Sequence, residues 1–166
     1  MLQNTFIHIQ SIGAITEQRL WESGIRDWAS INNEVSIPLS AGRKYHLDKG
    51  IAESLEHFQR YNPSHFSKRL PANQCWRLFP EFRESTVYLV IETTGLDRYF
   101  NDITTIALYD GQSMKTYVRG QNLEDFIEDI QKYKVIVSYN GKSFDIPFIE
   151  HYFNIRFDHA PIDLHY

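Results

Sequence analysis

The chain has 166 residues, 42% of them hydrophobic and 14% aromatic, enough to bury the core of one ordinary domain or of a small domain with an accessory segment. Its formal net charge of −4 is not the broad basic charge that is typical of nucleic-acid-binding proteins. The single cysteine, Cys75, excludes an internal disulfide and a thiolate zinc site. With neither a signal-peptide pattern nor an apolar run of membrane-spanning length, we expect a cytoplasmic protein that does not bind membranes.

The charge is divided unevenly along the chain. Residues 1–86 hold 10 Lys and Arg against 9 Asp and Glu, whereas residues 87–166 hold 7 against 12. Carboxylates are ligands for divalent cations, and a solvated acidic surface is the simpler alternative. We prefer the solvated surface for the acidic cluster at 124–129.

Residues 4–30 resemble a helix-hairpin-helix element, in which two short helices flank a glycine-rich hairpin. Ile9, Ile12 and Leu20 match its apolar positions, and Gly13 matches a hairpin glycine. The resemblance implies that backbone N–H groups of the hairpin face a phosphate of nucleic acid. Ser11, however, stands at a usual glycine position.

Ala14 and Ile15 replace the common Pro-Lys of this motif, so a phosphate-facing cation is missing. The alternative is a helical hairpin that serves only for packing. Its buried side would then consist of Leu20, Trp21, Ile25 and Trp28.

The next stretch, at about 31–86, completes a helical N-terminal segment. Apolar spacing predicts a helix over residues 46–61 with Asp48 as its N-cap, a short helix from Ser64 to Leu70, and another over 74–82. Eight basic residues lie in this stretch and could follow a phosphate backbone. Acidic residues are interleaved with them, so an ordinary helix surface is the preferred interpretation.

Residues 87–166 alternate between strand and helix patterns. An apolar strand at 87–92 is followed by a predicted hairpin, with strands at 104–109 and 114–118 around Asp110-Gly111. A helix capped by Asn122 should follow through Lys132, then a buried strand at 135–139 and a helix at 144–152. This order predicts an α/β fold of three antiparallel strands with a crossover to a parallel strand.

The segment from Tyr88 to Leu96 reads Tyr-Leu-Val-Ile-Glu-Thr-Thr-Gly-Leu. It resembles the first motif of the DnaQ-like (DEDD) 3′–5′ exonucleases of the ribonuclease H-like superfamily, which reads Asp-Ile-Glu-Thr-Thr-Gly-Leu. Glu92 matches the second acid of that motif. Val90 stands where the family has its first metal-binding aspartate, and a valine side chain cannot bind a metal.

The segment from Ser138 to Asp145 resembles the second motif of the same family, Asn-x-x-x-Phe-Asp. The resemblance makes Asp145 a metal ligand, and it gives Asn140 a part in orienting the substrate or the loop. Taken alone, an aspartate near the start of a helix is more often an N-cap. Lys142 could touch a phosphate or could be a solvated loop residue.

The resemblance implies a truncated ribonuclease H-like core at 87–166 and a site for two Mg²⁺ or Mn²⁺ ions that cleaves phosphodiester bonds. Glu92 and Asp145 would be its catalytic metal ligands, with only two of the four family acids present. Thr93, Thr94, Gly95 and Leu96 would hold the terminal nucleotide. The expected partner is DNA or RNA, as a single-stranded 3′ end.

The third family motif is not found before the chain ends at Tyr166. Asp163 lies in a segment that the family has between its second and third motifs, so it is not a safe substitute for the last acid. The family's closing helices are also missing, which would leave sheet surface open for self-association.

Two functions from different classes remain. One is a metal-dependent 3′–5′ exonuclease that is weak or inactive by itself. The other is a binding module on a degenerate nuclease fold that grips nucleic acid or a partner without cutting. An altered gene is a further explanation for Val90, because aspartate and valine codons can differ by a single base.

Overall fold

The computed structural model describes residues 1–31 and 39–166. These form two compact units, Met1–Glu81 and Phe82–Tyr166. The part of the expected N-terminal helical segment at residues 32–38 lies outside the described residues. Among the residues that are described, no helix is both long and apolar enough to cross a bilayer.

The first unit is helical, as the apolar spacing predicts. Its α-helices are α1 (Ala14–Glu22), α2 (Ala41–Gln59) and α3 (Pro63–Ser67), and its short 3-10 turns are η1 (Leu2–Asn4), η2 (Trp28–Ser30) and η3 (Ala72–Leu78). Helix α4 (Phe79–Phe82) contains the boundary between the units, and η4 (Arg83–Ser85) opens the second one.

The start of α2 differs from the prediction. The helix begins at Ala41 with Ser40 as N-cap, so Asp48 lies inside the helix and is not its cap. The side chains from Ala41 to Tyr45 are all exposed. Without a buried face, this turn has no apolar periodicity, and the helix becomes visible in the sequence only from Leu47 onward.

The first of the two helices expected in the helix-hairpin-helix element does not form. Residues 6–12 instead make consecutive turns, in which the Ile9 N–H donates to the Phe6 carbonyl at 2.9 Å and the Ile12 N–H to the Ile9 carbonyl at 3.1 Å. Ser11 has a φ of 66° in the left-handed region. Phe6, Ile9 and Ile12 are all buried in this segment.

An aromatic cluster forms the centre of this unit. The rings of Trp28 and Phe66 stack with centroids 5.7 Å apart, and the His8 ring lies 5.6 Å from that of Phe66. The buried carboxylate of Glu17, on α1, accepts hydrogen bonds from Thr5 Oγ1 and the Phe6 N–H, both at 2.6 Å. The N-terminal segment is thereby fixed to α1.

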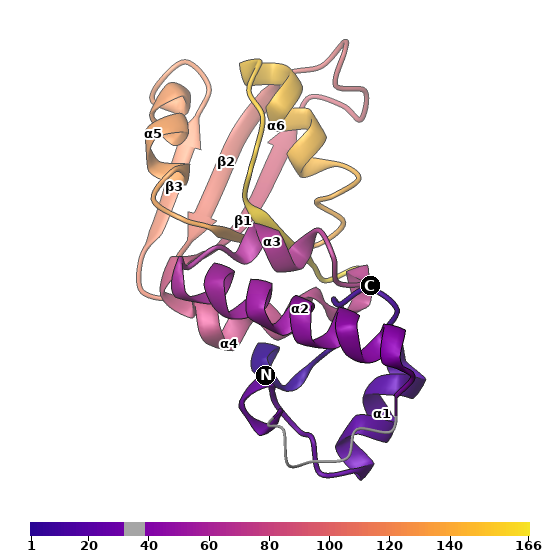
Figure 1. The fold of residues 1–166 in the computed structure, drawn as a ribbon. Helices are drawn as coiled ribbons and strands as arrows, with labels where there is room; N and C mark the ends of the chain where they lie inside the picture. The colour runs from indigo at the N-terminus through magenta and orange to yellow at the C-terminus, as the bar shows by residue number, and fades with distance from the viewer. Residues whose placement is uncertain (32–38) are drawn as a thin grey trace. The chain divides into compact units, whose positions relative to one another are not determined.

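The second unit is a five-stranded mixed sheet with the order β3-β2-β1-β4-β5 (Figure 1). Strands β1 (Thr86–Thr93), β2 (Ile103–Tyr109) and β3 (Met114–Val118) are antiparallel, and β4 (Val135–Ser138) and β5 (Ala160–Asp163) run parallel to β1. The predicted hairpin and the crossover to a parallel strand are confirmed. The prediction had no strand at β5.

Two helices connect the parallel part of the sheet. Helix α5 (Phe126–Ile130), which follows the 3-10 turn η5 (Leu123–Asp125), precedes β4, and α6 (Asp145–Phe153) follows it. The expected helix through Lys132 is therefore shorter. Asn122 does not cap it with its side chain, because the Asn122 Oδ1 accepts the Val118 N–H at 2.9 Å instead.

One face of the sheet packs against α5 and α6. Alternate residues of β1, namely Val87, Leu89 and Ile91, join Phe126 and Phe148 in a buried cluster. The other set of alternate positions is more exposed, and Val90 keeps 53% of its surface. The strand thus presents its even-numbered side chains away from the core.

Candidate active site

Glu92 lies near the end of β1, on the same face of the sheet as Val90. It pairs with Thr105 of β2, and the Thr104 hydroxyl donates to the Glu92 carbonyl oxygen at 3.0 Å. The register between β1 and β2 shifts just after Glu92. Its carboxylate is exposed, as expected for a side chain delivered to the rim of a sheet.

Asp145, the first residue of α6, is buried beside β1. Its Oδ1 accepts the Ile91 N–H at 3.1 Å. Strand β4 pairs with β1 only from Thr86 to Tyr88, so the carboxylate supplies the partner that the sheet no longer offers to Ile91. Asp145 thus lies beside the backbone of Ile91, the residue that precedes Glu92 in β1.

The surroundings of Asp145 act on its pKa in opposite directions. Burial raises the pKa of Asp145, and the negative charges of Asp163 and Glu92 raise it further. The hydrogen bond from the Ile91 N–H lowers it, but the net shift is upward. The cause is the cost of keeping a carboxylate charged away from water.

Asp163, at the end of β5, holds the loop that precedes α6. Its Oδ1 accepts the Asn140 N–H at 2.7 Å and the His165 N–H at 3.1 Å, and its Oδ2 accepts the Lys142 N–H at 3.0 Å. Both oxygens are thus engaged by backbone groups. Its position beside the second motif was not foreseen, because the prediction had no strand at β5.

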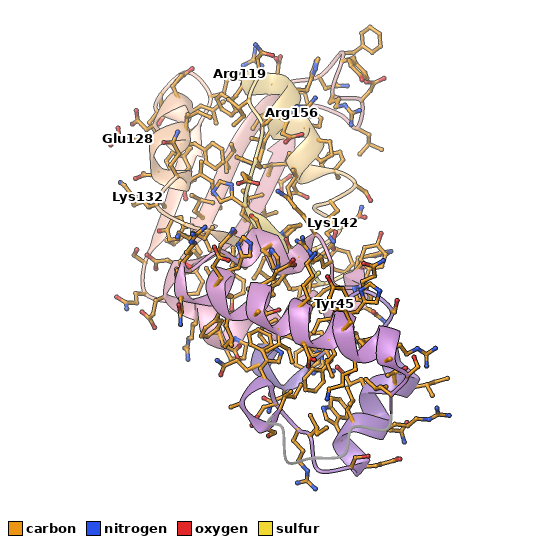
Figure 2. All side chains as sticks on the ribbon, viewed as in Figure 1. Tyr45, Arg119, Glu128, Lys132, Lys142 and Arg156 are labelled. Atoms are coloured by element: carbon orange, nitrogen blue, oxygen red, sulfur yellow. The ribbon has the colours of Figure 1, made fainter. Side chains whose placement is uncertain are left out.

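The loop itself depends on two residues with special backbone demands. Asn140 has a φ of 58°, in the left-handed region where asparagine is tolerated. A Cβ on Gly141 would collide with Ser138, so only glycine fits. Lys142 lies in this loop between β4 and α6 (Figure 2), half-buried, with its backbone N–H on Asp163.

The turn after Glu92 is held by its own side chains. Thr93 Oγ1 donates to the Gly95 carbonyl at 2.8 Å, and Thr94 Oγ1 donates to Asn101 Oδ1 at 3.2 Å. A Cβ on Gly95 would lie 2.5 Å from that Asn101 oxygen, which explains the glycine. Leu96 follows with 86% of its surface exposed.

The donor set does not match a two-metal site. Val90 offers no ligand, Asp163 has both oxygens on backbone N–H groups, and Asp145 already accepts one hydrogen bond. Within residues 1–31 and 39–166, no three carboxylate, histidine or cysteine side chains are grouped so that they could hold a metal ion. The rim supplies Glu92 and Asp145 only.

Comparison with known families assigns the fold of the second unit. Residues 87–166 match the model of the RNase_H superfamily, and together with the mixed sheet and its flanking helices this shows a ribonuclease H-like fold. None of the curated proteins matches the chain.

Solved structures with partial similarity include a DNA polymerase and a protein named NrnC. The family B DNA polymerase of Pyrobaculum calidifontis is 19% identical, with 42% of this chain and 11% of the polymerase covered and a TM-score of 0.33. Brucella melitensis NrnC bound to pGG is 17% identical; the match covers 46% of this chain and 39% of NrnC, with a TM-score of 0.34. NrnC with bound Mg²⁺ is 18% identical; the match covers 45% of this chain and 39% of NrnC, with a TM-score of 0.33. The chain thus spans about a tenth of the polymerase and about two fifths of NrnC.

Proposed function

We propose that the second unit binds the 3′ end of single-stranded DNA or RNA at the rim formed by Glu92 and Asp145, and that it hydrolyses phosphodiester bonds weakly or not at all by itself. The observation that carries this proposal is the pairing of an exposed Glu92 with a buried Asp145 that is fixed to the neighbouring Ile91 N–H. Both residues fall in motifs that resemble those of the DnaQ-like exonucleases.

The loop between β1 and β2 supports a single-stranded substrate. Leu96 and Phe100 each expose 86% of their surface and Tyr99 exposes 64%, yet the loop is fixed by the Thr94 N–H on the Asp102 carbonyl at 2.9 Å. The Arg98 guanidinium lies 5.1 Å from the centre of the Tyr99 ring. Exposed aromatic rings beside a cation are suited to stacking with unpaired bases.

Slow hydrolysis follows from Val90. Nucleases of the resembled family bring two Mg²⁺ or Mn²⁺ ions to the phosphate, and the ions supply a nucleophile and neutralise developing charge. In this chain Val90, which is 53% exposed on the same face as Glu92, carries an isopropyl group where the resembled motif has a carboxylate. Glu92 and Asp145 are the residues that would hold a remaining ion.

The decisive experiment is the substitution Val90→Asp with Val90→Asn as a matched control. Labelled single-stranded DNA and RNA are incubated with each protein and Mn²⁺, and 3′ shortening is followed. We expect little cleavage by the natural chain and a gain of roughly tenfold or more with aspartate only, because only a carboxylate adds charge for a cation. Rapid shortening by the natural chain would overturn the proposed weakness.

A purely non-catalytic module is the second candidate, and Val90 together with the incomplete acid set favours it. In that case single-stranded DNA binds without metal, with an affinity that falls as salt rises, and Val90→Asp gains no cleavage. No binding at low salt would exclude both candidates.

The exposed face of the sheet carries an apolar patch that could bind a second copy of the chain. Tyr88, Val90, Tyr109 and Met114 are all exposed on one face of β1, β2 and β3, and the Tyr88 and Tyr109 rings lie 6.0 Å apart. We propose that this apolar patch supports self-association. A molecular mass from light scattering that stays monomeric at high protein concentration would contradict it.

A further inference from the structure

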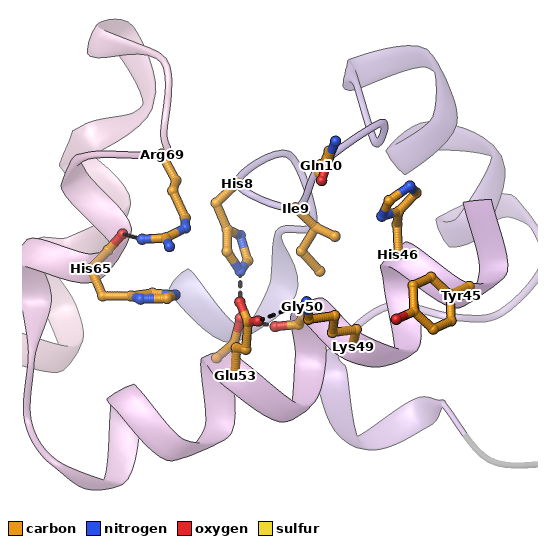
Figure 3. Close-up of a pocket in the computed structure, with 11 residues that line it drawn as sticks. His8, Ile9, Gln10, Tyr45, His46, Lys49, Gly50, Glu53, His65 and Arg69 are labelled. Atoms are coloured by element: carbon orange, nitrogen blue, oxygen red, sulfur yellow. Dashed lines mark hydrogen bonds and ion pairs between the residues drawn. The ribbon is translucent and has the colours of Figure 1, made fainter. Parts of the chain in front are cut away.

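A polar pocket of about 210 Å³ lies within the first unit, between the turns near His8, helix α2 and the residues that follow α3 (Figure 3). The side chains that matter for its chemistry are His8, His46, Lys49, Glu53, His65 and Arg69. They come from three separate segments of the chain.

A close backbone approach creates the pocket wall. A Cβ on Gly50 of α2 would lie 2.5 Å from Ile9 Cγ2, so glycine lets the helix meet the turn at this point. Lys49 and Glu53 of α2 thereby line the same pocket as His8. In Figure 3 the His8 ring lies between Arg69 and Ile9.

The hydrogen bonds of His8 define its protonation. The ring is buried, and its Nε2 lies 2.8 Å from Ser54 Oγ. Ser54 already donates its only hydroxyl hydrogen to the Gly50 carbonyl at 2.6 Å. The proton in the His8–Ser54 hydrogen bond must therefore come from Nε2.

The other nitrogen of His8 is then a bare acceptor. No group among the described residues donates to its Nδ1, which is buried. Burial, followed by the charges of His65 and Arg69, lowers the pKa of His8 to about 3, so the ring stays neutral. A buried acceptor without a donor is costly, and a bound hydroxyl group would remove that cost.

Two cations, Lys49 and Arg69, line the same pocket as His8. The Arg69 guanidinium donates once, from Nη1 to the His65 carbonyl at 2.9 Å, and its other N–H groups donate to nothing among the described residues. Lys49 Nζ lies 3.8 Å from Glu53 Oε1 in a loose and exposed pair, and Glu53 is the only carboxylate among the described residues that line the pocket. Two cations thus face one anion, which favours a negatively charged ligand.

We propose that this pocket binds a phosphate monoester or inorganic phosphate, with anionic oxygens toward Lys49 and Arg69 and a P–OH group donating to His8 Nδ1. Phosphate and its monoesters carry such a hydroxyl near neutral pH, since their relevant pKa is near 6 to 7. Sulfate and internal phosphodiesters carry the charge without the hydrogen. A site that accepts a hydrogen bond from its ligand rejects analogues that lack the donor.

The test compares inorganic phosphate with sulfate on the full chain at pH 6.5 and constant ionic strength, by calorimetry and by the ¹⁵N signals of the histidine rings. We expect saturable phosphate binding, at least about tenfold tighter than sulfate, with a shift of the His8 Nδ1 signal. Equal affinity for the two anions, or no saturable binding of phosphate, would overturn the proposal.

Substitutions locate the binding. Lys49→Met and Arg69→Met should each weaken phosphate binding by roughly tenfold, because each removes a cation from the pocket. Lys44→Met is the matched control, since Lys44 is an exposed residue of the same helix that does not line the pocket. A loss with Lys44→Met as large as with Lys49→Met would show nonspecific charge attraction and sink the proposal.

Competition identifies the source of the phosphate. If bound phosphate is displaced by a 5′-phosphorylated oligonucleotide but not by the same oligonucleotide with a 5′-hydroxyl, the ligand is the end of a nucleic acid. If a mononucleotide displaces the phosphate equally well, the ligand is a free nucleotide. If the 5′-hydroxyl oligonucleotide, which has no phosphate monoester, also displaces the bound phosphate, recognition of a monoester is contradicted. The binding of inorganic phosphate is measured without nucleic acid, so its result is independent of the function proposed for the second unit.

Discussion

The two units differ in what surrounds the buried polar atoms that they leave without a partner. His8, whose Nδ1 is such an atom in the first unit, lines a pocket together with Lys49 and Arg69, whereas Ser138 and His159 of the second unit do not line that pocket. In the second unit, Asp163 has both oxygens on backbone N–H groups and Asp145 accepts one from β1. In the first unit, one oxygen of Glu17 accepts from both Thr5 Oγ1 and the Phe6 N–H, and His8 keeps a nitrogen without a donor. A polar group that the fold itself satisfies serves structure, whereas one that the fold leaves open is available to a ligand.

The two units also show that a recognisable sequence motif and a complete binding site need not occur together. The second unit carries motifs that resemble those of a nuclease family, yet Val90 stands where the resembled motif has an aspartate. The first unit has no strong motif, yet its pocket brings together two cations and a bare acceptor. A motif therefore records ancestry, and side-chain geometry decides what each unit can still bind.

The largest effects should come from the aromatic core of each unit. Phe66→Ala and Phe126→Ala each remove a fully buried ring and should lower the free energy of unfolding by about 3–5 kcal/mol. All three tryptophans lie in the first unit, so tryptophan fluorescence reports on Phe66→Ala, and amide exchange in the sheet reports on Phe126→Ala. A loss below about 1 kcal/mol at either site would show that its ring is not part of the core.

The next effect is a pH dependence that belongs to the first unit. The pKa of His8 is lowered to about 3 and that of His65 to about 4, so the unfolded chain binds more protons than the folded chain below the ordinary value of 6.5. Stability is fully present above that value and falls as the pH drops toward 4, by roughly 2–4 kcal/mol. His8→Gln should flatten this dependence in urea titrations, and an unchanged slope would contradict the buried neutral ring.

Two buried carboxylates provide a matched pair across the units. Asp163→Asn puts an NH₂ group against a backbone N–H, because both Asp163 oxygens accept hydrogen bonds, and it should cost about 1–3 kcal/mol. Glu17→Gln can keep its oxygen on both donors, because a single Glu17 oxygen accepts both bonds, and it should cost less. Chemical denaturation measures both. If Asp163→Asn were neutral, the loop from Asn140 to Lys142 would not depend on that carboxylate.

The smallest effect is expected at the surface of the second unit. Arg119, which is labelled in Figure 2, places its Nη1 2.7 Å from Asp102 Oδ2, but both side chains are about half exposed. Water and salt screen such a pair, so Arg119→Met should change the free energy of unfolding by less than about 1 kcal/mol. A larger loss would mean that the pair organises the β1–β2 loop, and it would also show as lost protection of the Thr94 amide.

Much of the second unit could be predicted from local pattern. The apolar run of β1 and the alternation of β2 and β3 around the Asp110-Gly111 turn predicted the antiparallel strands, and the apolar run at 135–139 predicted β4. The first unit was harder because α2 starts with an exposed turn and residues 6–12 fold as turns. Strand β5 was missed since it is short and contains Pro161, which is unfavourable within a strand.

By itself, the sequence determined which residues could bind a metal and that Val90 could not, because ligand chemistry belongs to the side chain. The tertiary structure alone decided where buried polar groups find partners. The bond from Ile91 to Asp145 joins residues 54 positions apart, and that between His8 and Ser54 joins residues 46 apart. No local pattern encodes such pairs, since they form only when packing brings distant segments within hydrogen-bonding distance.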